Sequence, residues 1–443
     1  MNIPVETKNP LDSSGLQSQK KLFAGDKTLW MIIALLMIMS LLSVYSAISN
    51  EAFAHNSSVF APMLKHVGLM VMGLIVCVVF SHIPTKLWRR FALFGLLLGI
   101  ALLILTQFMG IERNGGKRWL SILGFEFQTS EIARLCLINY IAFKLSVEEY
   151  ASKRTFIHIA LATGAICIPI FLQNISSGLL LGMTAYVLCF LGKVHMRTFI
   201  KATVAMIVGA VLLVALLLIL PMDVVNKIPG RFGTGKARIE SFIGKNEKKE
   251  LADDDGKSFQ RIQANIAIVK GGVTGVGPGN SESRLVLPQP FSDFIFVIIL
   301  EEYGLFAGLL CIALYIWLLF YIGKLASRLK LFYPKFLVIG IGIIICTQAL
   351  IHMMVNVGIM PVTGQTLPFI SKGGSSYLVT SVYFALILSA SRELEEQREV
   401  AIAQMSGGDT PVSINTEIIP EVPITDASYY DDEKSQSHKS SKA

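Results

Sequence analysis

Ten stretches of predominantly apolar residues follow one another along the chain, separated by short polar segments. They cover residues 28–48, 62–83, 91–109, 131–147, 155–172, 178–193, 199–221, 293–323, 333–355 and 374–391. A helix needs roughly 20 such residues to cross the hydrocarbon core of a bilayer. The pattern predicts an all-α integral membrane protein of ten transmembrane helices, with one long external loop between helices 7 and 8.

Basic residues alternate with the predicted spans. Lys86, Arg89 and Arg90 follow the second span, and later Lys/Arg clusters mark every second loop. The loops at 49–61 and 173–177 contain no Lys or Arg. The positive-inside rule therefore places both termini in the cytoplasm and the long loop outside it.

The composition agrees with a membrane protein, since 53% of the residues are hydrophobic and the net charge is +8. Most of that charge follows the loop asymmetry, which gives a nucleic-acid partner little support. All six cysteines fall within predicted spans and are expected to be buried structural thiols.

The chain is expected to consist of three regions, with a long loop inside the second. Residues 1–27 are polar, without a cleavable signal, and form a cytoplasmic N-terminal segment, while residues 28–391 form the membrane domain. The external loop at 222–291 includes a predicted short helix at 258–269. Residues 392–443 begin with a charged helix and continue as an acidic, disordered cytoplasmic tail.

Several polar side chains lie within predicted spans, where exposure to lipid would cost about 3 kcal/mol or more. Glu131 and Arg134 are one helical turn apart and are expected to pair. Gln348, His352 and Asn356 recur at every fourth position and share one helix face. A structural ion pair and a helix–helix hydrogen-bond seam remain open beside the alternative that these groups line a polar site.

Three acids flank the apolar run "FIFVIIL". Counting about 20 residues outward from the cytoplasmic end of this span puts the outer edge of the hydrocarbon near Gly304. The apolar run then needs protein cover, which the 222–291 loop can supply. Asp293, Glu301 and Glu302 are expected to project into a crevice beneath this loop, where a lipid-linked headgroup enters.

The last outer loop, "GIMPVTGQTLPFISKGGSS" at 358–376, contains two prolines and four glycines. Irregular backbone at membrane depth is tolerated where it is buried in protein or lines a cavity. The composition favours a re-entrant loop that forms part of a site.

Four motifs occur in order and resemble those of one family. "NGGKRWLSILGFEFQTSEIARL", "IAIVKGGVTGVGPGNS", "SDFIFVIILEEYG" and "LPFISKGGSS" are similar to the signatures of the SEDS family (shape, elongation, division and sporulation), also called the FtsW/RodA family. With the ten-span layout, the resemblance covers about residues 25–392. "GQTLPFIS" and the long acidic tail are closer to the division branch, FtsW, than to the elongation branch, RodA.

The resemblance implies a peptidoglycan glycosyltransferase that polymerises lipid II into glycan strands at the outer face of the bacterial inner membrane, in the septum. It also implies a class B penicillin-binding protein (an FtsI-like transpeptidase) and divisome proteins as partners. The family's essential acid corresponds to Asp293. A carboxylate there suits removal of a proton from a sugar hydroxyl.

Undecaprenyl diphosphate is the leaving group in this chemistry, and basic residues are expected around it. The candidate substrate-binding residues are Arg118, Glu131, Arg231, Arg238, Arg261, Lys270, His352, Lys372, Ser375 and Ser376, with Lys236 as a further cation. A divalent cation, Mg²⁺ or Mn²⁺, held by Asp293 and the diphosphate is compatible with the chemistry, but no clustered ligand motif demands one.

The chain departs from the family pattern at four places. Lys372 stands where the family usually has Tyr, and Thr363 where division members commonly have Lys. Phe291 and Ser292 replace His-Thr before the acid. "LQNISSG" replaces the family's Q-P-D-x-G motif, so no catalytic group is assigned there.

Two alternatives from other classes remain open. A lipid II flippase would also use intramembrane polar groups and a broken loop, but it requires a polar path to the cytoplasmic side. A non-catalytic scaffold for division proteins is supported only by the tail. The elongation polymerase of the RodA branch is the alternative within the family.

Overall fold

The computed structural model describes residues 25–54, 60–113, 116–122, 125–147, 152–221, 256–361 and 363–405, together with residues 224, 233 and 236. Arg231 and Arg238, two of the expected cations, lie outside these ranges, as do most of the 222–255 stretch and the tail beyond 405. The N-terminal 24 residues are also outside the described part.

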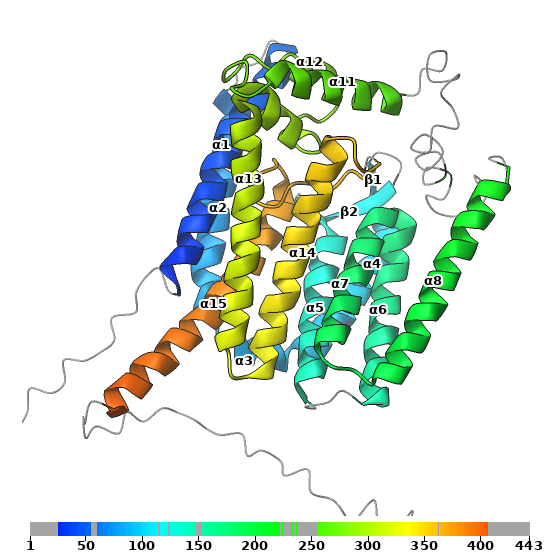
Figure 1. Cartoon of the computed structure of the whole chain (residues 1–443), viewed down its shortest axis with the longest axis vertical. Helices are drawn as coiled ribbons and strands as arrows, with labels where there is room; N and C mark the ends of the chain where they lie inside the picture. The colour runs from blue at the N-terminus through cyan, green and yellow to red at the C-terminus, as the bar shows by residue number, and fades with distance from the viewer. Residues whose placement is uncertain are drawn as a thin grey trace, which may run out of the picture. The chain divides into compact units, whose positions relative to one another are not determined.

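A helix coincides with each of the ten predicted spans (Figure 1). The helices are α1 Lys27–Ala54, α2 Phe60–Ser81, α4 Ala92–Met109, α5 Thr129–Val147, α6 Lys153–Gln173, α7 Ile175–Leu191, α8 Met196–Ile219, α13 Ile295–Arg328, α14 Phe332–Asn356 and α15 Gly374–Met405. Among the described residues, seven helices are long and apolar enough to cross a membrane, namely α1, α2, α4, α6, α13, α14 and α15, while α7 is a shorter apolar helix. The all-α membrane fold is confirmed, and the number of crossings remains a prediction.

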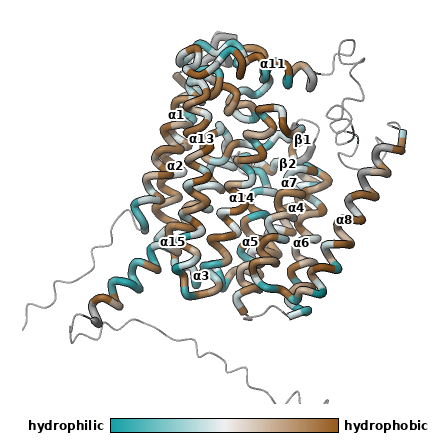
Figure 2. Tube along the Cα trace, viewed as in Figure 1, coloured by the Kyte–Doolittle hydropathy of each residue, from teal (hydrophilic) through white to brown (hydrophobic). Residues whose placement is uncertain are grey.

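The helices differ in how much of their surface other helices cover. In α14 and α15, 72% of the most apolar 18-residue window is buried inside the protein, against 22% in α2 and 28% in α4 and α6. A helix that is apolar on all sides belongs either inside a bundle or against lipid. Figure 2 shows mainly hydrophobic residues along α2, α4 and α6, and hydrophilic residues in the C-terminal part of α15. We therefore assign α14 and α15 to the centre and α2, α4 and α6 to the lipid-facing periphery.

A small sheet interrupts the helical pattern between α4 and α5. Its strands are β1 Ile111–Arg113, β2 Gly116–Ile122 and β3 Phe125–Gln128, antiparallel in the order β1-β2-β3. No strand was expected from the sequence, because these segments are only three to seven residues long and lack a sustained apolar alternation. The sheet leads without a break into α5.

The described part of the external loop includes the helices α11 Gly256–Gly271 and α12 Ser283–Val286, drawn across the outer end of α13 in Figure 1. The predicted helix at 258–269 is thereby confirmed. Ala264 and Ala267 of α11 pack with Leu287 against Phe294 and Val297. The expected protein cover over "FIFVIIL" is confirmed as well, since residues 295–300 are all buried.

Helix α13 breaks at Gly304, where φ is +74° and ψ is −172°. The carbonyl oxygens of Glu301 and Glu302, which the break leaves without helical partners, accept from the N–H groups of Val276 at 2.9 Å and Gly277 at 3.0 Å. The loop following α11 therefore completes the hydrogen bonding of the broken helix.

Glycines allow this close approach of two backbones. A Cβ on Gly304 would lie 2.3 Å from the carbonyl oxygen of Val273, and one on Gly275 would lie 2.1 Å from that of Glu302. Both contacts are far inside van der Waals distance, so neither position has room for a side chain. The glycine-rich motif after α11 is explained by this contact.

The predicted charged helix after the last span exists as a continuation of α15 to Met405. The described residues up to Glu395 belong to one compact unit, and those from Glu396 to Met405 belong to another. The expected boundary at 391 and the nature of the tail stay predictions.

Candidate functional site around Asp293

Asp293 lies in a tight turn immediately before α13. The N–H groups of Ser292 and Asp293 both donate to the carbonyl oxygen of Gln289 at 3.1 Å. The hydroxyl of Ser292 donates to Oδ1 of Asp293 at 3.0 Å, and the Asp293 side chain is half-buried. The turn therefore presents an oriented, partly accessible carboxylate.

The other carboxylate oxygen of Asp293 faces the loop between α14 and α15. A Cβ built on Gly364 would lie 3.6 Å from Oδ2 of Asp293, and Gly364 has a positive φ of +65°. Gly364 is exposed. A residue without a side chain therefore lies beside Oδ2 of Asp293.

The irregular segment between α14 and α15, here called the buried loop, is mostly buried over residues 365–371, whereas Ile359, Met360 and Gly364 of the same segment are exposed. Leu367, Phe369 and Ile370 are at most 2% exposed, and Gln365 and Ser371 are also buried. The role of this loop in a site stays a prediction, but it contacts the Asp293 turn directly. The N–H of Lys372 donates to the carbonyl oxygen of Phe291 at 2.9 Å.

Lys372 and Phe291, which both differ from the family pattern, contact each other. The ammonium of Lys372 lies 4.4 Å from the centroid of the Phe291 ring, within the range of a cation–π contact. Lys372 was expected to add a cation near the site. Its charge lies beside Phe291, which precedes Asp293 by two residues in the chain.

The polar face of α14 bonds to the loop and to the turn. Gln348 Nε2 donates to the carbonyl oxygen of Thr366 at 3.0 Å, and His352 Nδ1 donates to that of Gln365 at 2.7 Å. Asn356 Nδ2 donates to the carbonyl oxygen of Asp293 at 2.9 Å. The expected shared face is confirmed, and most of its partners are loop and turn backbone rather than side chains of a neighbouring helix.

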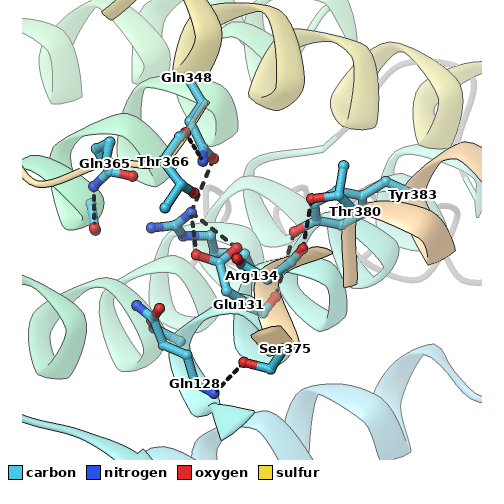
Figure 3. Close-up of polar contacts among 12 residues, drawn as sticks. Gln128, Glu131, Arg134, Gln348, Gln365, Thr366, Ser375, Thr380 and Tyr383 are labelled. Atoms are coloured by element: carbon cyan, nitrogen blue, oxygen red, sulfur yellow. Dashed lines mark hydrogen bonds and ion pairs between the residues drawn. The ribbon is translucent and has the colours of Figure 1, made fainter. Parts of the chain in front are cut away.

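Glu131 and Arg134 form the expected ion pair, with Arg134 Nη1 3.1 Å from Glu131 Oε1. Arg134 also donates to Gln348 Oε1 at 3.3 Å, which links α5 to α14 (Figure 3). Both charged side chains are buried. Within the described residues, Nε and Nη2 of Arg134 and Nε2 of His352 make no hydrogen bond, so this buried cluster retains unsatisfied polar atoms.

Glu301 and Glu302 do not project into a crevice, which corrects the expectation from the sequence. They are 0% and 1% exposed. The hydroxyl of Ser281 donates to Glu301 and that of Ser46 to Glu302. The N–H of Glu282 also donates to Glu301, at 3.1 Å. These two acids fasten the external loop to α13 and α1, and Asp293 is the accessible acid of the three.

The basic residues expected to bind the diphosphate lie at different places in the structure. Arg118 of β2 donates twice to the carbonyl oxygen of Gln173, at 2.7 and 3.1 Å. Lys270 pairs with Glu282 at 2.5 Å. Lys236 donates to the carbonyl oxygen of Leu220.

Arg261 lies close to the start of the buried loop. A Cβ on Gly358 would be 3.7 Å from Nε of Arg261, and the arginine is exposed. Asn356, which contacts Asp293, precedes Gly358 by two residues. Among the described residues, Arg261 and Lys372 are therefore the expected cations that lie at this loop.

Ser375 and Ser376 begin α15. The Ser375 hydroxyl is buried and accepts from the N–H of Gln128 at 3.0 Å, which ties β3 to α15 (Figure 3). Ser376 is half-buried, and its carbonyl oxygen accepts from Thr380 at 2.8 Å. Ser375 has a structural partner, whereas the substrate-binding role expected for both serines stays a prediction.

A divalent cation shared between Asp293 and the diphosphate of a substrate stays a prediction. Within the described residues, no three His, Cys, Asp or Glu side chains gather to form a metal site. Magnesium is commonly bound by one or two carboxylates together with substrate phosphates. Asp293 would supply one carboxylate to such a cation, and the diphosphate would have to supply the other oxygen ligands.

Ser371 and Gly364 belong to the site although the sequence assigned them no role. Both lie inside the loop predicted to be re-entrant, and Ser371 belongs to the quoted "LPFISKGGSS" motif. Their contacts with the 291–293 turn depend on how the loop folds back. The position of Ser371 within this motif was the signal in the sequence that could have identified it.

A family model described as "Cell cycle protein", covering FtsW, RodA and SpoVE, matches residues 26–396. A protein of Coxiella burnetii named probable peptidoglycan glycosyltransferase FtsW is 30% identical over 383 residues, covering 83% of this chain and 96% of the relative. A protein of the same name from Saccharophagus degradans is 28% identical over 384 residues, covering 84% of this chain and 94% of the relative.

Solved structures share the fold. A chain of a peptidoglycan synthase complex that coordinates polymerization and crosslinking has a TM-score of 0.67 at 20% identity, covering 84% of this chain and 98% of that one. Thermus thermophilus RodA, a rod shape determining protein, has a TM-score of 0.60 at 20% identity, with 84% and 97% covered. The chain therefore belongs to the FtsW/RodA/SpoVE family of cell cycle proteins, the SEDS family, and is FtsW-like.

Proposed function

We propose that this protein is a peptidoglycan glycosyltransferase that polymerises lipid II, with Asp293 as its general base. The names of the FtsW relatives support the activity. The observation that carries the role of Asp293 is its geometry. It is the one accessible acid of the three near the outer end of α13, oriented by Ser292 and set against the buried loop.

Asp293 acts on the sugar hydroxyl that attacks. The 4-hydroxyl of a GlcNAc is a weak nucleophile, and a carboxylate that takes its proton in the transition state accelerates attack by about 10²–10⁴-fold. The oxygen bonds to the anomeric carbon of MurNAc as undecaprenyl diphosphate departs with the bonding electron pair. A single displacement inverts the anomeric configuration, because the accessible acid is used as the base and not as a nucleophile.

Basic side chains stabilise the departing diphosphate in this proposal. Arg261 lies beside the loop that contacts the turn, and Lys372 lies beside the turn itself. Arginine binds phosphate with two parallel hydrogen bonds, and fixed positive charge near a leaving group lowers the barrier electrostatically. Arg261 is therefore the first candidate for the diphosphate.

The setting of the reaction completes the proposal. The enzyme spans the cytoplasmic membrane several times with both termini inside, and it works at the outer face of the membrane in the division septum. A class B penicillin-binding protein, the FtsI-like transpeptidase, is its partner and crosslinks the glycan strands. The related synthase complex, which coordinates polymerization and crosslinking, supports such a pairing.

Replacing one carboxylate tests the proposal. The purified protein, alone and with its transpeptidase, is incubated with labelled lipid II, and glycan strands are resolved by gel. Asp293→Asn is expected to lower polymerisation by at least about 10²-fold, because the amide accepts no proton at neutral pH. Glu282→Gln, an exposed acid paired with Lys270 in the same external region, is the matched control and retains activity. Full polymerisation by Asp293→Asn would refute the proposal.

A further inference from the structure

We propose that Asn356 and Ser371 are positioning residues that fix Asp293 through its backbone, an inference that rests on the function proposed for that acid. Three consecutive carbonyl oxygens, those of residues 291, 292 and 293, each accept a hydrogen bond from the segment 356–372. The buried loop and the end of α14 thus act as a cradle for the turn that carries the base.

The three bonds come from three different kinds of donor. The N–H of Lys372 bonds the carbonyl of Phe291, the hydroxyl of Ser371 bonds that of Ser292 at 2.8 Å, and the carboxamide of Asn356 bonds that of Asp293. A peptide group whose oxygen is held in a buried setting resists rotation, because rotation would leave the carbonyl unpaired. With three successive carbonyls held, the direction of the Asp293 side chain is set by the loop.

Asn356 also supplies a cap for α13. The residue before this helix is Phe294, whose side chain has no polar atom to accept the N–H groups of the first turn. The oxygen of the Asn356 carboxamide accepts the N–H of Val297 at 3.2 Å instead. Its second amide hydrogen bonds the carbonyl oxygen of His352 at 2.9 Å. At 1% exposed, Asn356 holds both the carbonyl of residue 293 and the start of the helix that follows it.

Ser371 connects the loop to the turn through one hydroxyl. Its oxygen accepts the N–H of Leu367 at 2.8 Å while its hydrogen goes to the carbonyl of Ser292. The side chain is 3% exposed, so water does not readily replace either bond. Removing the hydroxyl unpairs a loop amide and a turn carbonyl together, which frees the turn to shift.

A shift of the turn affects turnover more than substrate binding. A displacement of about 1 Å in a reacting group can cost about 10²-fold in rate. Neither Asn356 nor Ser371 has a free polar atom left for substrate, since each is occupied by backbone partners. We expect Ser371→Ala and Asn356→Ala to lower kcat for lipid II polymerisation by about 10- to 100-fold, with KM changed by less than about threefold.

Two matched controls carry the same chemical change elsewhere in the bundle. Ser389 of α15 is buried and donates to the carbonyl oxygen of Ile83 at 2.7 Å, and Asn139 of α5 is buried and donates to that of Trp88 at 3.0 Å. Ser389→Ala therefore removes one buried side-chain-to-carbonyl bond remote from Asp293 in the sequence. Asn139→Ala removes another, together with the bond that Oδ1 of Asn139 accepts from the hydroxyl of Tyr333. Both controls are expected to retain the wild-type kcat.

Hydrogen–deuterium exchange of the whole protein in detergent gives a second readout that needs no substrate. Peptides covering residues 289–298 should exchange faster in Ser371→Ala and Asn356→Ala than in the wild type, and at the wild-type rate in the two controls. Unchanged exchange in Ser371→Ala, the milder variant, would overturn the inference. So would a KM that rises as much as kcat falls.

The exchange result also separates this inference from the proposed function. If Asp293→Asn polymerises lipid II normally, the proposed function fails and the positioning role fails with it, whatever the exchange shows. If Asp293→Asn is inactive but Ser371→Ala and Asn356→Ala polymerise at the wild-type rate, the positioning role alone fails.

Discussion

The buried Glu131–Arg134 pair can be tested for a structural role against a role in substrate binding. The sequence left both roles open. The two side chains are 9% and 1% exposed and 3.1 Å apart, and Arg134 shares a further bond with Gln348. Removing one partner of a buried pair leaves an uncompensated charge and typically costs about 3–5 kcal/mol. Replacing both by apolar residues of similar size often costs little.

A double-mutant cycle with Glu131→Leu and Arg134→Met measures this coupling. Each single variant should lower the free energy of unfolding by about 3–5 kcal/mol, and the double variant should be more stable than either. Unfolding is followed by denaturant titration in mixed micelles, and polymerisation of lipid II is assayed in parallel.

The two readouts together assign the pair its role. If the pair is structural, the double variant regains activity along with stability. A double variant that is stable but inactive would place Glu131 or Arg134 in substrate binding. Destabilisation of the double variant by the full sum of the two singles would refute the coupling, since independent sites add.

Two further predictions concern the break in α13 and the contact beside the turn. Gly304→Ala should destabilise the protein by more than about 3 kcal/mol, because the positive φ alone costs about 1–3 kcal/mol and the new Cβ would meet Val273. Gly323→Ala in the same helix, which has open space around it, should be neutral or stabilising in the same thermal denaturation assay, and equal losses would contradict this account. Lys372→Met should remove about 1 kcal/mol of cation–π attraction to Phe291, and the expected loss of stability should disappear when Phe291 is already Leu.

The positions of the helices, and the need for protein to cover the start of α13, were predictable from the local pattern of apolar residues. Apolar windows located a helix at every predicted span, and an apolar run extending beyond Gly304 required protein cover, which α11 provides through Ala264 and Ala267. These inferences depend only on how much apolar surface a stretch contains and how long it is. That information is present in the order of residues along the chain.

The partners of polar groups were not predictable in the same way. The four-residue spacing placed Gln348, His352 and Asn356 on one face, but their partners are backbone carbonyls of a loop whose path no periodicity describes. Glu302 bonds Ser46, which is 256 residues away. A carboxylate in an apolar stretch looks the same in sequence whether it is clamped by a distant serine or open to a substrate.

The short sheet was missed for a related reason. Its strands pair with one another through backbone bonds across β1, β2 and β3, and its longest strand has seven residues. Strand Gly116–Ile122 mixes charged, aromatic and apolar residues rather than alternating them. The strands lie against the ends of α4 and α5. Their pairing depends on these contacts between elements and is not visible in the local sequence.

The break at Gly304 divides α13 into two mechanical parts. The membrane part runs on to Arg328, while Ile295–Tyr303 is joined to the segment after α11 by main-chain bonds that take the place of helical ones. A load on that external segment is therefore transmitted to the nine residues following Asp293 before it reaches the span. Gly304 therefore works as a joint, and a protein docking on the external loop would act on the part of α13 that adjoins Asp293 before it acts on the part that runs to Arg328.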